Sequence, residues 1–194
     1  MKRLFFVMIL VLAVAGAASA HNGVLSLFAD QSADKCSAAL ATCQSVPMYL
    51  MYVRGSGPEI SNGMAFRLEK SSSGAAFLEP QWPGSFLTFG SLQSGIDVVV
   101  RADEGWCSGA GTVSYMGTIP VVNFSETGKF TVSVVDAPNY GGVIVTLCQQ
   151  GYPLYRAIGG TFVFNGKCKC PEDPFGEILA VETTSWGGIK SLYR

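Results

Sequence analysis

Histidine is nearly absent from this chain of 194 residues, in which His21 is the single example. Hydrolysis by a Ser-His-Asp or Cys-His arrangement needs an imidazole held in a fixed position. His21 lies where we expect the mature chain to begin, and chain termini are usually mobile. No GxSxG sequence, which marks the nucleophile of many hydrolases, is present either. The sequence therefore argues against triad catalysis.

Charged residues are also scarce, at 14% of the chain, and Lys and Arg form no cluster. Without a basic patch, no nucleic acid partner is expected. There is no DxDxDG run for calcium and no pair of CxxC sequences for a four-thiolate zinc site. We therefore expect no cofactor.

Long hydrophobic runs are missing except at the start of the chain. Lys2 and Arg3 precede an apolar run from Leu4 to Val14, and a small-residue cleavage sequence ends at Ala20. This order predicts a helical, cleavable signal peptide over 1–20. The run is shorter than the about 20 residues that a membrane span needs. We expect a secreted protein, in the periplasm, at the cell surface or outside the cell, with no membrane span after signal cleavage.

Six cysteines follow the signal peptide, and an even number in an exported chain predicts three disulfides. Fifteen pairings of six cysteines exist, and the sequence does not choose among them. Two cysteines are seven residues apart, so they can pair only if the segment between them is a compact loop rather than a helix. Two others flank one lysine and should pair elsewhere. The candidates are Cys36, Cys43, Cys107, Cys148, Cys168 and Cys170.

Most of the mature chain consists of short alternating apolar segments separated by turn residues, which predicts strands. Met64, Phe66 and Leu68 share one face of such a segment, for example. No helical segment long enough for a parallel crossover is present. We expect about eight to ten strands in an all-β, antiparallel β-sandwich of immunoglobulin-like architecture over 21–170, preferred to a small barrel.

Five details of this prediction can be compared with the structure. Val46–Arg54 is expected to be a central strand, and Phe86–Phe89 a short edge strand. Gly117 is expected to break one segment into two strands. Ser125–Gly128 and Ala137–Gly142 are expected to be hairpin turns.

The character of the chain changes after Cys170, where two prolines enclose two acidic residues. We expect 171–194 to be a C-terminal tail with a short helix over Trp186–Tyr193. The tail either packs on the sandwich or is recognised by another molecule. Its recognition candidates are Trp186, Ile189, Tyr193 and Arg194.

The two ends of the mature chain, HNGVLSLFAD over His21–Asp30 and TSWGGIKSLYR over Thr184–Arg194, resemble a known group. It comprises uncharacterised secreted β-sandwich proteins of environmental Gram-negative bacteria with a TWGxIKxLYR-like C-terminal tail. Ser185 stands where the group usually has threonine. The resemblance implies export, a sandwich body and a role of the tail in sorting or surface attachment. It implies no activity and no catalytic residues.

Aromatic residues in predicted loops are the best candidates for ligand binding. Trp82 lies between Gln81 and Pro83, and Tyr140 follows Asn139. Loop aromatics on a rigid sandwich commonly bind sugar rings or proteins, although they can equally plug the end of the sandwich. Trp106, beside Cys107, is better explained by packing on a disulfide.

The sequence thus favours a non-enzymatic protein with a binding, adhesion or envelope-structural role, whose partner is a protein or glycan at the cell surface. One alternative is a copper-binding protein that uses the amine and imidazole of His21, although no second histidine completes the site. Another is a carbohydrate-active hydrolase, which needs two carboxylates across a cleft. No carboxylates are paired by the sequence.

Overall fold

The computed structural model describes residues 23–54, 61–100, 113–125, 128–147 and 154–167. All regular secondary structure in these ranges is β, and they contain no helix long and apolar enough to cross a membrane. The strands are β1 (Gly23–Phe28), β2 (Ser37–Ala38), β3 (Ser45–Arg54), β4 (Ser61–Lys70), β5 (Ala75–Phe77), β6 (Phe86–Ser91), β7 (Gly95–Val100), β8 (Val113–Asn123), β9 (Phe130–Val135), β10 (Val143–Leu147), β11 (Leu154–Gly159) and β12 (Thr161–Phe164).

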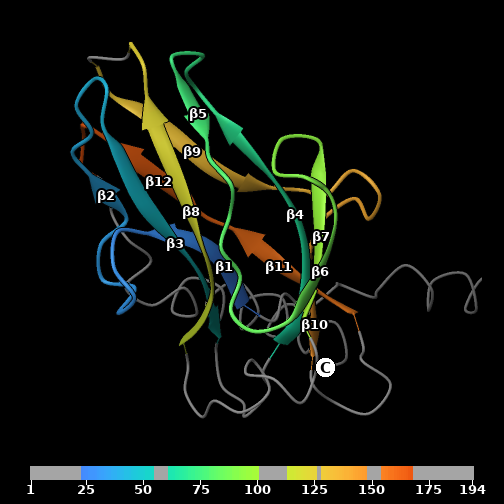
Figure 1. The fold of residues 1–194 in the computed structure, drawn as a ribbon. Coiled ribbons are helices and arrows are strands. Elements are labelled where there is room, and N and C mark those ends of the chain that lie inside the picture. The colour runs from blue at the N-terminus through green and yellow to red at the C-terminus, as the bar shows by residue number, and fades with distance from the viewer. Residues whose placement is uncertain (1–22, 55–60, 101–112, 126–127, 148–153, 168–194) are drawn as a thin grey trace, which may run out of the picture.

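The strands form two layers, which Figure 1 shows crossing one another. The first layer runs β1-β3-β8-β5, with antiparallel neighbours throughout. In the second layer β4 is central. Its first half pairs with β10 and with β7, and its second half pairs with β9. β6 pairs with β7 and lies outside it. β12 and β11 flank β9 and β10, and β11 also pairs with β1 in parallel. The layers are therefore joined along one edge, while β5 and β6 lie at the opposite edge.

The core lies between the layers because alternate residues of each strand point inward. Met64, Phe66 and Leu68 of β4 are at most 4% exposed, as the alternation predicts. Phe130 stacks on Phe164 of the paired strand β12, with ring centroids 4.7 Å apart. The sandwich architecture is thus confirmed, and the pairing is antiparallel except between β1 and β11 and between β2 and β12.

The segment before β3 forms no helix. Its short strand β2 pairs in parallel with β12, and the part around Cys36 covers the outer face of the first layer in a small cluster with Phe28, Met51 and Val53. β3 is accordingly buried on both faces from Leu50 to Arg54, as expected of a central strand.

The prediction that Gly117 ends a strand is wrong. β8 runs without interruption through Gly117, with a register shift against β3 between Leu50 and Met51. The indole of Trp82 packs directly over Gly117, and a Cβ built there would lie 2.4 Å from Trp82 Cε3. The glycine therefore makes room for a side chain rather than ending the strand.

The hairpin prediction for Ser125–Gly128 is wrong, and the prediction for Ala137–Gly142 holds for the turn but not for the pairing of the flanking strands. β8 and β9 belong to different layers, so the chain crosses the sandwich near Ser125–Gly128. β9 and β10 do not pair with each other along their lengths; both run antiparallel to β4, one after the other. Between them Asp136–Gly142 leaves the sheet and closes on itself, with the Ala137 N–H donating to the Gly142 carbonyl at 3.0 Å. We call this segment the excursion.

Two of the six cysteines lie in the described ranges. Cys36 is buried and disulfide-bonded. Cys43 is exposed, has a φ of 62° in a tight turn and carries a free thiol, so its predicted disulfide is not formed in this structure. Four cysteines lie outside the described residues, as do the signal peptide, His21, Trp106 and the whole tail with Trp186, Ile189, Tyr193 and Arg194.

Candidate functional site

Strand β6 forms one edge of the second layer. Within the described part of the chain it pairs only with β7, from Phe86 opposite Val100 to Ser91 opposite Gly95. All six of its residues are exposed, and its sequence, FLTFGS, contains neither a charge nor a proline. Antiparallel strands point alternate backbone groups to opposite sides, so about half of those in β6 face the unpaired side. Proteins usually protect such edges with charges, prolines or bulges.

The outward face of this edge is apolar. Leu87 is 64% and Phe89 63% exposed, and Val99, directly opposite Leu87 on β7, is 47% exposed. Paired residues of neighbouring strands point to the same side, so these three side chains form one surface. We call Leu87, Phe89 and Val99 the outer apolar patch.

Tyr140 borders this patch. It lies in the excursion, is 40% exposed, and its hydroxyl donates to Asp97 Oδ2 at 3.2 Å. Asp97 is opposite Phe89 in the β6–β7 pairing. The negative charge of Asp97, together with some burial and the hydrogen bond, raises the pKa of Tyr140 above its ordinary value of 10.0. The phenol therefore stays protonated and neutral beside the patch at physiological pH.

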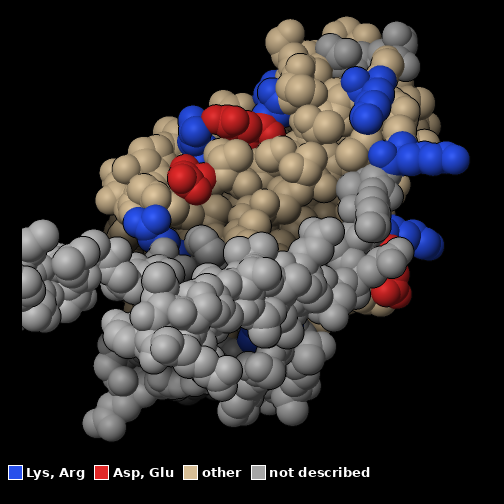
Figure 2. Space-filling view, turned by 180° about the vertical axis from the view of Figure 1, so that it is seen from behind, with Lys and Arg blue, Asp and Glu red and all other residues tan. Residues whose placement is uncertain are grey.

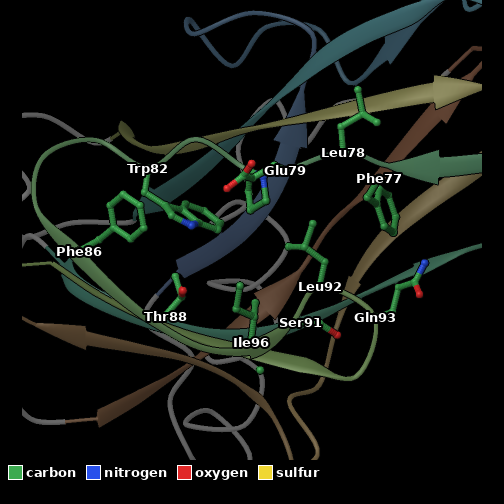
Figure 3. A pocket seen from close by; sticks show the side chains of 12 residues that line it. Phe77, Leu78, Glu79, Trp82, Phe86, Thr88, Ser91, Leu92, Gln93 and Ile96 are labelled. Carbon is green, nitrogen blue, oxygen red and sulfur yellow. The ribbon is translucent and has the colours of Figure 1, made fainter.

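A pocket opens on the other side of β6, between the two layers. Its volume is about 450 Å³, and its lining comes from the end of β5, the following loop, β6, the β6–β7 turn and β7. In Figure 3 Trp82 and Phe86 lie at one end and Phe77 at the other, with Leu92 and Ile96 along one side. Trp82, Leu92 and Ile96 are at most 8% exposed, so the inner wall is apolar.

Trp82 lies in the predicted loop but is only 8% exposed, because its indole forms a wall of this pocket. Gln81, next to it, exchanges two backbone hydrogen bonds of 2.8 Å with Thr118 of β8. This bridge fixes the loop on the first layer and turns the indole inward against Gly117. Trp82 therefore fits both alternatives that the sequence left open, since it packs on Gly117 between the layers and also lines a pocket.

The pocket and the outer apolar patch can bind apolar groups, but the described residues around them offer little for catalysis. The pocket is lined by one charged side chain, Glu79, whereas glycoside hydrolysis needs two carboxylates. Asp97 is on the outer face, opposite in direction to its neighbour Ile96. No cluster of three potential metal ligands occurs among the described residues. On the face seen in Figure 2 the charged side chains are scattered among uncharged ones.

Trp82 and Tyr140, the two predicted ligand-binding residues, lie on opposite sides of the β6–β7 pair and do not form one site. Sequence reasoning missed Phe86, Leu87 and Phe89, although it predicted their edge strand. The signal was available: an edge strand without charge or proline is unusual.

Neither a protein-family model nor a curated protein matches this chain. Among solved structures, it is similar to a cohesin module from a Clostridium perfringens family 33 glycoside hydrolase. The TM-score is 0.52 at 7% identity, over 76% of this chain and 99% of that one. The sixth cohesin of Acetivibrio cellulolyticus scaffoldin B, solved in complex with a Cel5 dockerin, gives a TM-score of 0.49 at 13% identity, over 75% and 99%. At these identities the first likeness supports the fold, a β-sandwich, and nothing more.

Proposed function

We propose that this protein is a non-enzymatic binding module that acts outside the cytoplasm. It takes an extended segment of a partner protein onto the edge of β6 that pairs with no other described strand. The observation that supports the proposal is the exposure of all six residues of an uncharged, proline-free edge strand. Strand addition uses backbone hydrogen bonds for affinity and side chains for selectivity. An uncharged edge accepts an uncharged, β-branched segment at little desolvation cost.

The outer apolar patch supports the same proposal. A segment added beside β6 continues the sheet, so its outward side chains lie next to Leu87 and Phe89. Both side chains are more than 60% exposed, which leaves most of their apolar surface to be covered by a partner. We propose that this binding serves adhesion or an envelope-structural role.

The test uses labelled twelve-residue peptides of alternating Thr and Val, measured by fluorescence anisotropy with the purified protein. Two further peptides carry N-methyl groups on alternate amides, one set on each edge of the strand. Because only one edge of an added strand is paired, one methylated peptide should lose binding and the other should keep it. Equal binding of the two methylated peptides would overturn strand addition.

Matched substitutions locate the binding edge. Phe89→Lys should weaken peptide binding at least tenfold because it places a charge on the patch. Phe124→Lys, at 61% exposure and outside any strand, should leave binding unchanged. Equal effects of the two variants would place the binding surface elsewhere.

The location outside the cytoplasm is supported by the signal-like sequence over 1–20 and by the tail sequence over Thr184–Arg194. We propose that the tail directs sorting or surface attachment. The experiment compares the localisation of the full chain with that of a chain ending at Thr183. Unchanged surface display of the shortened chain would remove the role of the tail while leaving the binding proposal intact.

A further inference from the structure

The pocket and the proposed binding edge share strand β6. Phe86, Thr88 and Gly90 line the pocket, whereas Leu87 and Phe89, between them, point to the outer face. Side chains alternate along every strand, so a segment added to β6 directs every second side chain toward the pocket side. The mouth of the pocket is therefore within reach of a side chain of the added segment.

The inner wall of the pocket suits a large apolar side chain. Trp82, Leu92 and Ile96 are 8%, 7% and 4% exposed and present indole and aliphatic surface. The volume of about 450 Å³ lies within the range of ligand pockets, about 300–1,000 Å³. An aromatic side chain placed there would remove apolar surface from water on both partners, which is the principal source of affinity in such anchors.

Charge adds a second preference. Glu79 is the only charged residue among the twelve that line the pocket, and it is exposed. A basic residue in the partner next to the anchor would find a carboxylate of opposite sign, and an acidic residue would be repelled.

From these contacts we infer that the pocket is the specificity site of the β6 edge: it takes an aromatic side chain of the added segment and favours a neighbouring Lys or Arg. This inference rests on the proposed function, whose strand addition brings the anchor to the pocket.

The experiment compares Thr-Val peptides that carry a central Phe or a central Ala, each with a neighbouring Arg or Glu. On the unaltered protein the Phe peptide should bind about tenfold to a hundredfold more tightly than the Ala peptide, as expected for burial of a large apolar side chain. Arg should be preferred to Glu, and Glu79→Gln should reduce that preference. Equal affinity of the Phe and Ala peptides would overturn the inference.

A variant of the protein gives a second, independent result. Thr88→Trp fills the mouth of the pocket from an exposed position, and Thr88→Val keeps the size of the side chain. The Trp variant should weaken binding of the Phe peptide at least tenfold more than binding of the Ala peptide, and the Val variant should keep the preference of the unaltered protein for the Phe peptide. Thermal melting of both variants confirms that they fold, and the peptide comparison on the unaltered protein decides the question if either does not.

The two proposals fail in different ways. If the N-methylated peptides are distinguished but Phe and Ala bind equally, strand addition stands and the anchor pocket is rejected. If Phe is preferred but the methylated peptides bind equally, the pocket binds an aromatic group without strand pairing, and both the strand addition and the inference that rests on it are rejected.

Discussion

At the scale of single residues, the contact between Gly117 and Trp82 determines how the wall of the pocket is held. The indole occupies the space above a glycine in the middle of β8, with no room for a Cβ. The closest atoms, Trp82 Cε3 and Cζ3, belong to a rigid ring, and the Gln81 carbonyl oxygen lies 3.0 Å from the Cβ position. A methyl group at Gly117 must therefore displace the loop.

Gly117→Ala should lower the free energy of unfolding by about 1–3 kcal/mol, as expected for overpacking of a closely packed core. Urea denaturation followed by tryptophan fluorescence measures the change. The control is Gly128→Ala, where a Cβ meets nothing within 4 Å and the change should stay within about 0.5 kcal/mol. Equal stability of the Gly117 variant and the unaltered protein would mean that the loop adapts at no cost.

Tyr140 allows a prediction about pH. Because Asp97 raises the pKa of its hydroxyl above 10.0, the phenol stays neutral in the folded protein at pH values where it ionises in the unfolded chain. The contribution of this pair to stability is therefore complete below about pH 10 and is lost as the pH rises through the raised pKa. In Asp97→Asn the pKa of Tyr140 should fall toward 10.0.

Ultraviolet difference titration of phenolate absorbance measures this pKa. Subtracting the titration curve of Tyr140→Phe isolates the signal from those of the other six tyrosines. Identical Tyr140 titrations with and without the Asp97 carboxylate would contradict the assigned interaction.

At the scale of elements, Asn165 attaches the segment after β2 to the end of β12. Its Oδ1 accepts the Leu40 N–H at 2.8 Å, and its Nδ2 donates to the Leu40 carbonyl at 3.1 Å and the Gly128 carbonyl at 3.3 Å. The side-chain amide thus extends the pairing of β2 with β12 by one backbone unit. Asn165 has a φ of 54°, a conformation that asparagine tolerates better than most residues.

Asn165→Gly should lower the free energy of unfolding by about 1–3 kcal/mol because it removes these hydrogen bonds while keeping a residue that accepts the positive φ. Hydrogen exchange of the Leu40 amide should become faster. The Val163 amide, which donates to the Cys36 carbonyl at 3.0 Å, should change less and serves as the internal control. Unchanged exchange at Leu40 would show that the side chain does not hold this segment.

Local alternation predicted most strands, because the period of two reports burial directly. It could not predict which strands pair. The turn residues of Ser125–Gly128 and Ala137–Gly142 signalled changes of direction, yet β9 pairs with β4 and β12, which are distant in sequence. The roles of Gly117 and Trp82 could not be predicted separately. The glycine makes room for the indole, and the two residues come into contact only because the loop packs on β8. The residues around Trp82 predicted a loop, but they could not predict that its indole points inward.

At the scale of the whole molecule, the sandwich is asymmetric. One edge is joined by the parallel pairing of β11 with β1, while β5 and β6 end the layers at the other edge. The pocket and the outer apolar patch both lie at this second edge. The sequence could predict β6 as an edge strand, but the joining of the layers and the pocket depend on long-range pairing. That is why the candidate site was only partly foreseen.

An uncharged, exposed edge also promotes association between copies of the chain. The double variant Leu87→Lys with Phe89→Lys should therefore aggregate at a higher temperature than the unaltered protein, as measured by light scattering during heating. Its unfolding midpoint should change by no more than a few degrees, since both side chains are exposed. Leu154→Lys, at 60% exposure on a strand paired with both β10 and β1, should not delay aggregation. A delay of the same size in this control would assign aggregation to general surface hydrophobicity.

The excursion between β9 and β10 has a practical consequence for engineering. Its ends are tied by the antiparallel Ala137–Gly142 bridge, and β9 and β10 are each held independently by their pairing with β4. Foreign sequences grafted at Asn139 would be displayed beside Asp97 on an otherwise unaltered scaffold. A library of such grafts would turn the second layer into a rigid platform for selecting new recognition loops.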